Sequence, residues 1–123
     1  MKEETNKGLN KKLKRISKEL KLLGISPSRE GYWYLRDSIY LCLINQKYNI
    51  KITKDIYPTL SKKYHKKCTA IEKAIRTAIE KGWTNCNLEY ATELFANTIP
   101  YDKDRPTNSE FISTISERIS LEI

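Results

Sequence analysis

The sequence predicts an all-α fold of about six helices, in which the third and fourth form a helix-turn-helix. Apolar residues recur at steps of three and four along most of the chain, as on one face of a helix. The four glycines and four prolines fall mostly between these periodic segments. A chain of 123 residues suits one core, so we expect a single helical domain over residues 1–123, with residues 1–8 flexible.

The first two helices have clear apolar faces. The first spans about residues 9–23, is lysine-rich on its other face, and is followed by Gly24, which suits the C′ position. The second runs from a cap at Ser28 to about residue 46. We expect it to be the central core helix, and the side chains that it should bury are Tyr32, Trp33, Leu35, Ile39, Tyr40 and Leu43.

The middle of the chain predicts a short third helix. Residues 47–52 form a connection that could include a turn of strand, and Thr53 is a suitable N-cap for the third helix. Pro58 removes one intrahelical hydrogen bond, so it either bends the helix or marks its true first turn. We favour a short, bent helix that ends near Tyr64.

Three further helices complete the chain. The fourth spans about residues 68–83, and its inner face consists of Ile71, Ala74, Ile75, Ala78, Ile79 and Trp83. A fifth is expected near 88–96, before a loop at 97–106. Thr107 and Glu110 form a capping box for the last helix, which should bury Phe111, Ile112, Ile115 and Ile119.

Positive charge is concentrated in the first and middle parts of the chain. The net charge is +8, and residues 47–82 carry ten basic against three acidic side chains, whereas residues 83–123 carry three against seven. Clustered Lys and Arg replace counterions on a phosphate backbone, so this asymmetry favours a polyanionic partner. No apolar run approaches the ~20 residues of a membrane helix and no secretory signal precedes the first helix. We therefore expect a cytoplasmic protein without membrane association.

A short helix, a brief joint and a second helix with a polar-basic outer face are typical of a helix-turn-helix. The helix at 68–83 would then read the major groove of double-stranded DNA. Its candidate base-contacting residues are Thr69, Ala70, Glu72, Lys73, Arg76 and Thr77. The candidate phosphate contacts, at the two ends of the third helix and in the joint, are Thr53, Lys54, Lys62, Lys63, Lys66 and Lys67. The alternative is an ordinary solvated face, stabilised by an Arg76–Glu80 pair.

No catalytic or metal site is expected. His65 and Cys68 have the spacing of a ligand pair, but no second pair accompanies them. His65 also lacks a nucleophile partner, and no paired-carboxylate or glycine-rich phosphate motif occurs. We therefore expect no enzyme activity, metal or cofactor. The three cysteines suit reduced thiols, and Cys68 is either a redox-sensitive thiol or, as we favour, a partly buried one.

Four runs in order resemble a known family: GYWYLRDSI (31–39), ITKDIYPTLSKKY (52–64), IEKAIRTAIEKGW (71–83) and RPTNSEFI (105–112). They resemble the C-terminal DNA-binding effector domain of the stage-zero master regulator of sporulation in endospore-forming bacteria, from about residue 12 onward. The resemblance implies a six-helix fold, a helix-turn-helix of helices three and four, and binding to promoter boxes as tandem copies.

Two departures from that family stand out. The family's proteins carry an N-terminal receiver domain, and nothing of that kind precedes the first helix here. The family's recognition helix starts with Ser-Arg-Val-Glu-Arg, whose first arginine reads a guanine, whereas residues 69–73 are Thr-Ala-Ile-Glu-Lys. A lost bidentate arginine contact removes ~1–3 kcal/mol of discrimination. Ala70 therefore predicts a changed or weakened DNA box.

The prediction is a sequence-specific, double-stranded DNA-binding transcription regulator linked to sporulation control. The rival is an interaction protein that does not bind DNA and modulates the full-length sporulation regulator or RNA polymerase. Its contact surface would be acidic and would include Glu89, Glu93, Asp102 and Asp104. RNA binding is a third and less well supported hypothesis. Proteins that read single-stranded RNA present aromatic side chains on which bases stack, and most tyrosines here are expected on inward faces. Homodimers and tandem copies on DNA both stay open, as does a role for the first helix in contacting neighbouring DNA.

Overall fold

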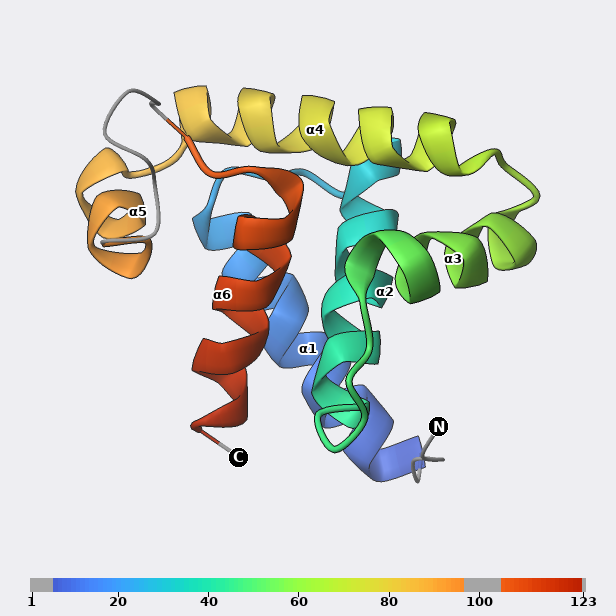
Figure 1. Ribbon diagram of the computed structural model, residues 1–123. Coiled ribbons are helices and arrows are strands. Elements are labelled where there is room, and N and C mark those ends of the chain that lie inside the picture. Colours follow the sequence, from blue (N-terminus) through green and yellow to red (C-terminus); the bar gives the residue numbers. More distant parts are fainter. Residues whose placement is uncertain (1–5, 97–104, 123) are drawn as a thin grey trace.

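The computed structural model describes residues 6–96 and 105–122 (Figure 1). The described elements are α1 (Asn6–Leu22), α2 (Glu30–Ile44), the π-helical turn η1 (Ile52–Ile56), α3 (Tyr57–Tyr64), α4 (Cys68–Asn85), α5 (Leu88–Leu94) and α6 (Asn108–Ser120). The all-α class with six helices is confirmed. The described residues contain no strand, so the turn of strand considered for 47–52 is wrong. The loop expected at 97–106 and the flexibility expected at 1–8 fall mostly outside the described residues.

Helix α2 forms the centre of the fold. It contacts α1, α3, α4 and α6, and α4 lies across one end of the group formed by α1, α2 and α6 (Figure 1). The α2–α4 crossing is close at Gly31, where an added Cβ would overlap the backbone carbonyl of Ala74. The predicted core residues Tyr32, Leu35, Ile39 and Leu43 are buried. None of the helices in the described part of the chain has the length and apolar content needed to span a bilayer.

Two predictions about α2 are wrong. The helix starts at Glu30 after Arg29, not after Ser28, because the Ser28 hydroxyl and backbone N–H interact with the Ser26 hydroxyl in the preceding turn. Trp33 is 39% exposed, since it lies on the side of α2 that faces solvent, where its ring contacts Tyr32 and the Arg36 guanidinium. Tyr40 is only half-buried.

Gly24 occupies the C′ position after α1, as the sequence predicted. Gly24 has a positive φ of 77°, its N–H donates to the carbonyl of Lys21, and the N–H of Ile25 donates to that of Leu20. This pair of bonds is the Schellman arrangement, which satisfies carbonyls left open at a helix end. An added Cβ at Gly24 would also lie 2.6 Å from the carbonyl oxygen of Gly82, so glycine allows α1 to meet the end of α4 closely.

The start of the third helix differs from the prediction. Thr53 lies inside η1, and Lys51 is the residue that precedes the turn. The N–H groups of Asp55 and Ile56, which a cap at Thr53 would bind, both donate to the carbonyl of Lys51. The Asp55 carboxylate in turn accepts a hydrogen bond of 2.7 Å from the backbone N–H of Lys51. Pro58 lies in the first turn of α3, which confirms the second of its two predicted roles.

The C-terminal half packs largely as predicted. α4 extends two residues further than expected, and α5 ends two residues earlier. Thr107 and Glu110 form the predicted capping box of α6. Phe111 stacks on Phe95, the residue that follows α5, and the Trp83 ring meets the same Phe95 edge-on, with 5.5 Å between ring centroids in both contacts.

A buried carboxylate joins α1, α5 and α6. Glu19 is fully buried, and it accepts hydrogen bonds from Arg15 (3.2 Å) and from the Tyr90 hydroxyl (2.5 Å). Arg118 of α6 lies 3.7 Å from the same carboxylate, and Arg15 also binds Glu122. A buried charge is costly unless it is paired and hydrogen-bonded. The network therefore fixes how α5 and α6 sit on α1.

We predict that Tyr90→Phe destabilises the fold by about 1–2 kcal/mol, because it removes a hydrogen bond to a buried charge. Urea unfolding followed by circular dichroism measures this loss. The matched control is Tyr48→Phe, since the Tyr48 side chain is 54% exposed and has no hydrogen-bond partner among the described residues. Equal stabilities for the two variants would contradict the role given to Tyr90.

The same prediction has a pH signature. Burial, and then the hydrogen bond to Glu19, raises the pKa of Tyr90 to about 12. The neutral phenol is the form that stabilises the fold, so its contribution is complete below the ordinary tyrosine pKa of about 10 and is lost as pH rises towards 12. The stability difference between wild type and Tyr90→Phe should shrink over that interval. A difference that stays constant up to pH 12 would contradict the assignment.

Candidate nucleic-acid interface

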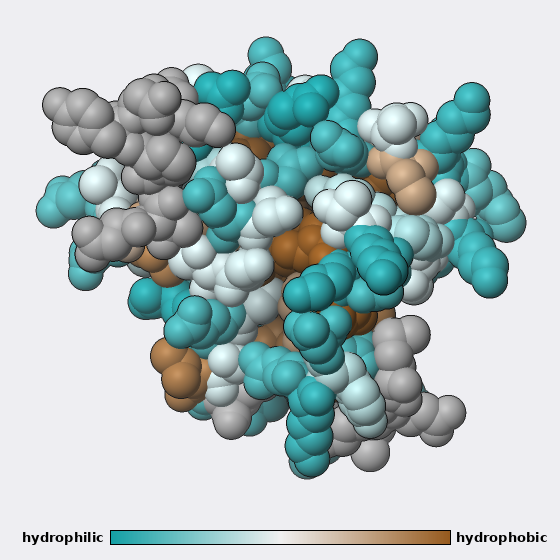
Figure 2. All heavy atoms as spheres, viewed as in Figure 1, coloured by the Kyte–Doolittle hydropathy of each residue, from teal (hydrophilic) through white to brown (hydrophobic). Residues whose placement is uncertain are grey.

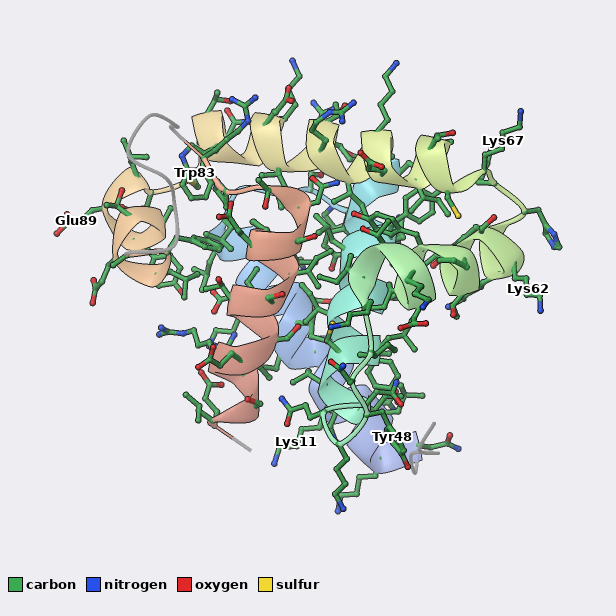
Figure 3. All side chains as sticks on the ribbon, viewed as in Figure 1. Lys11, Tyr48, Lys62, Lys67, Trp83 and Glu89 are labelled. Carbon is green, nitrogen blue, oxygen red and sulfur yellow. The ribbon has the colours of Figure 1, made fainter. Side chains whose placement is uncertain are left out.

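The outer face of α4 is open to solvent along its length. Ile71 and Ile75 are fully buried beneath the helix, and the long side chains on the opposite side point away from the rest of the molecule (Figure 3). All six candidate base-contacting residues are exposed, namely Thr69, Ala70, Glu72, Lys73, Arg76 and Thr77. One amphipathic helix therefore packs on α2 with one side and presents with the other a polar ridge that carries two cations, Lys73 and Arg76, and one acid, Glu72.

The joint between α3 and α4 carries a compact group of lysines. The joint consists of the three residues 65–67, and its first residue, His65, turns the chain with a left-handed φ of 55°. Lys62 lies in the last turn of α3, Lys66 and Lys67 follow His65, and all three are exposed. Lys62 and Lys67 extend into solvent at the end of the molecule that α3 and α4 share (Figure 3). Hydrophilic residues cover this end and the outer side of α4 (Figure 2).

Two further phosphate candidates, Thr53 and Lys54, lie apart from the joint. Both are exposed and belong to η1, at the opposite end of α3. The turn leads directly into α3. Candidate phosphate contacts are thus available at both ends of α3, with the start of the α4 ridge at one of them.

Two charged residues of the ridge have different partners from those considered in the sequence. Arg76 pairs with Glu72, one turn earlier, at 3.6 Å, while Glu80 pairs with Arg105 at 3.3 Å. The Arg76–Glu80 pair is therefore wrong. Both Arg76 and Glu72 side chains are about half exposed. An exposed pair at this distance is weak, so the Arg76 guanidinium remains available to a ligand.

Asp37 of α2 anchors the end of α3. Its nearly buried carboxylate accepts hydrogen bonds from the Lys63 ammonium (2.8 Å) and the Tyr64 hydroxyl (2.5 Å), and the neighbouring Arg36 also donates to it. The Tyr64 ring packs edge-on against Tyr34. Burial, and then Asp37, raises the pKa of Tyr64 well above the ordinary tyrosine range. The charge of Lys63 is thus partly neutralised within the protein, although 57% of its side chain is exposed.

A hollow of about 550 Å³ lies beside the ridge, where η1, α3, α4 and the start of α6 meet. Arg76 and Glu72 line one side of it, and Arg105 and Asn108 line another. The Asn108 amide donates to the backbone carbonyl of Glu72 at 3.0 Å and to the Tyr57 hydroxyl at 3.3 Å. These bonds tie the start of α6 to α4 and α3 beside the hollow.

The cysteines lie away from any ligand cluster. All three are free thiols of intermediate exposure, and Cys68 is the first residue of α4. Within residues 6–96 and 105–122, no group of three or more His, Cys, Asp or Glu side chains could hold a metal ion.

Comparison with protein families agrees with this geometry. A family model described as "Sporulation initiation factor Spo0A C terminal" matches residues 16–119. The chain belongs to this family. Spo0A C-terminal domains are non-catalytic DNA-binding domains of transcription regulators, so the resemblance noted in the sequence and the expectation that the chain is not an enzyme are both confirmed. The match begins at Ile16, inside α1, and it includes the whole of α2 through α5.

The residues that hold this Spo0A-type interface in place were missed in the sequence. Asp37 is the one acid inside the apolar part of α2, and Glu19 is the one acid among the lysines of α1. An acid at a position close to an inward face needs a partner, and this was the available signal. Nothing local marks Asn108, because its partners are 51 and 36 residues away in the sequence.

We predict that Asp37→Asn destabilises the protein by about 1.5–3 kcal/mol, because hydrogen bonds to a charged group are lost or weakened. Hydrogen exchange should show the largest loss of protection in α3, whose end Asp37 holds. The charge-matched control is Glu89→Gln, which neutralises an exposed acid on α5. An Asp37→Asn variant as stable as this control would contradict the anchoring role.

Proposed function

We propose that this protein binds duplex DNA as a transcription regulator linked to sporulation. In this proposal α3 and α4 form a helix-turn-helix, α4 enters the major groove, and the protein acts in the cytoplasm, where bacterial DNA is accessible. The observation that carries the proposal is the exposed α4 ridge of a chain that belongs to a DNA-binding family. An α-helix fits the major groove, which is ~12 Å wide.

Affinity is proposed to come mainly from charge at the joint. Lys62, Lys66 and Lys67 are exposed and form no ion pair with the described residues. Phosphate contacts of this kind are independent of base sequence, and each releases counterions from DNA. The backbone N–H groups and side chains of η1 are proposed to contact a further phosphate through Thr53 and Lys54.

We predict that Lys67→Gln weakens binding to every duplex alike and lowers the slope of log K against log salt by about 0.9. Fluorescence anisotropy with one duplex over a range of salt concentrations measures both effects. Lys47→Gln is the matched control, because Lys47 is an equally exposed lysine in the turn after α2. If the two variants have the same slope, the joint does not contact phosphates.

Base reading is proposed to depend on Arg76, Lys73, Glu72 and the two threonines, since Ala70 offers only a methyl group. We predict that Arg76→Ala relaxes the preference at one base pair by ~1–3 kcal/mol. The reciprocal variant Ala70→Arg should gain discrimination of the same size at a guanine. Selection of preferred duplexes from a random pool, followed by competition binding, measures both. Unchanged preferences in both variants would rule out α4 as the reading element.

The rival proposal is a protein-interaction role without DNA binding. Its support is Ala70, which lies exposed where the family's recognition helix has an arginine. Glu89 and Glu93 of α5 are exposed and could take part in an acidic contact surface. Asp102 and Asp104, the other two residues predicted for that surface, lie outside the described residues.

One pair of binding measurements separates the two proposals. The purified protein is mixed with a fluorescent promoter fragment and, separately, with the full-length sporulation regulator or RNA polymerase. Salt-sensitive binding to the fragment supports DNA recognition, and its concentration dependence distinguishes one copy from a homodimer or tandem copies. No DNA binding, together with a stable protein complex, supports the rival.

A further inference from the structure

A second cationic surface lies on α1, outside the proposed interface. Five lysines of this helix are exposed, and their spacing alternates between four and three residues, so they share one face within an arc of about 80°. We call this face the lysine stripe, and it consists of Lys7, Lys11, Lys14, Lys18 and Lys21. From first to last it spans about 21 Å along the helix axis.

The stripe is not balanced by acids. Glu19 is the one acidic residue of α1, and it is buried on another face. None of the five lysines forms an ion pair with any residue in the described part of the chain. Arg15 and then Arg118 lower the pKa of the Glu122 carboxyl most, and the charge of Lys18 also helps to lower it.

Helix stability does not explain the stripe. Lysines three and four residues apart repel one another, and each such pair weakens the helix. The first turn of α1 holds Lys7 and no acid, although the helix dipole favours negative charge there. The opposite side of α1 is already occupied, since Ile16, Leu20 and Leu23 are buried in the protein's own core. An anionic ligand would remove the repulsion.

The stripe and the α4 ridge face different surroundings. The first half of α1 lies at the end of the molecule opposite α4 (Figure 1), and Lys11 points away from the side that carries Lys67 (Figure 3). A straight duplex along α4 therefore does not cover the stripe. Lys7, Lys11 and Lys14 also precede Ile16, where the match to the Spo0A family begins.

We propose that the lysine stripe binds the phosphate backbone of a second duplex DNA segment, so that one copy of the protein holds two duplexes together. The inference rests on the proposed function of α4. Duplex DNA carries one phosphate per ~1.7 Å of its axis when both strands are counted, so a segment as long as the stripe carries about twelve phosphates, which five ammonium groups can approach. Contacts of this type do not read sequence, and the second segment can have any base sequence.

The test uses two duplexes and three proteins. One duplex, the sequence preferred by α4, is fixed to beads, and capture of a second, fluorescent duplex of unrelated sequence is measured at several salt concentrations. Wild type is compared with Lys11→Gln/Lys14→Gln, which removes two charges from the stripe, and with Lys11→Arg/Lys14→Arg, which keeps them. Affinity for the first duplex alone is measured for each protein.

Wild type and the arginine variant should capture the second duplex, and the glutamine variant should lose ~10-fold or more of that capture while keeping its affinity for the first. Equal capture by the glutamine variant would overturn the proposal, and it would assign bridging to associated copies of the protein that each bind one duplex through α4. The proposal would also be overturned if wild type bound the first duplex and did not capture the second. The same holds if the stripe bound phosphatidylserine vesicles and no second duplex. If no duplex binds at all, the proposed function of α4 itself fails.

Discussion

The close crossing of α2 and α4 is the contact on which the candidate interface depends. Gly31 allows the two helices to approach until an added methyl group would overlap the backbone of α4. Ile71 and Ile75 are then completely buried beneath α4, and the side of the helix that cannot be buried is the one with Lys73 and Arg76. The position of the cationic ridge is thus a consequence of apolar packing on its other side.

The charged residues of this chain include two contrasting groups, buried acids that are paired and exposed lysines. The fully or nearly buried acids, Glu19 and Asp37, face inward and bind cations and tyrosines from neighbouring helices. Most lysines outside these two networks, among residues 6–96 and 105–122, are exposed and form no ion pair with another described residue. Buried pairs of opposite charge are costly to break, so they hold α3, α5 and α6 in place. The unpaired surface charge is left to attract polyanions.

The sequence predicted the helices better than their starts and their partners. Helical periodicity is a local property, so the inner faces of α4 and α6 followed directly from Ile71, Ile75 and Phe111. Ser28 and Thr53 are good capping residues that are not caps. The Ser28 hydroxyl binds the Ser26 hydroxyl, and the N–H groups that Thr53 would cap donate to the Lys51 carbonyl. Asp37 and Asn108 bind residues far away in the sequence. The sequence indicates that Asp37 needs a partner, but a single sequence does not identify which residue it is.

Under the two proposals, for α4 and for the lysine stripe, Ala70 and the stripe alter DNA binding in the same direction. Alanine at position 70 removes a side chain that would read a base, which lowers discrimination and leaves phosphate contacts unaffected. The lysine stripe, part of which lies before the residues matched by the family, adds charge that cannot read bases at all. Both features shift the balance from sequence reading to backbone attraction. Under the proposed function, such a regulator would gain affinity for DNA in general, and its choice of site would depend on the few polar side chains that remain on α4.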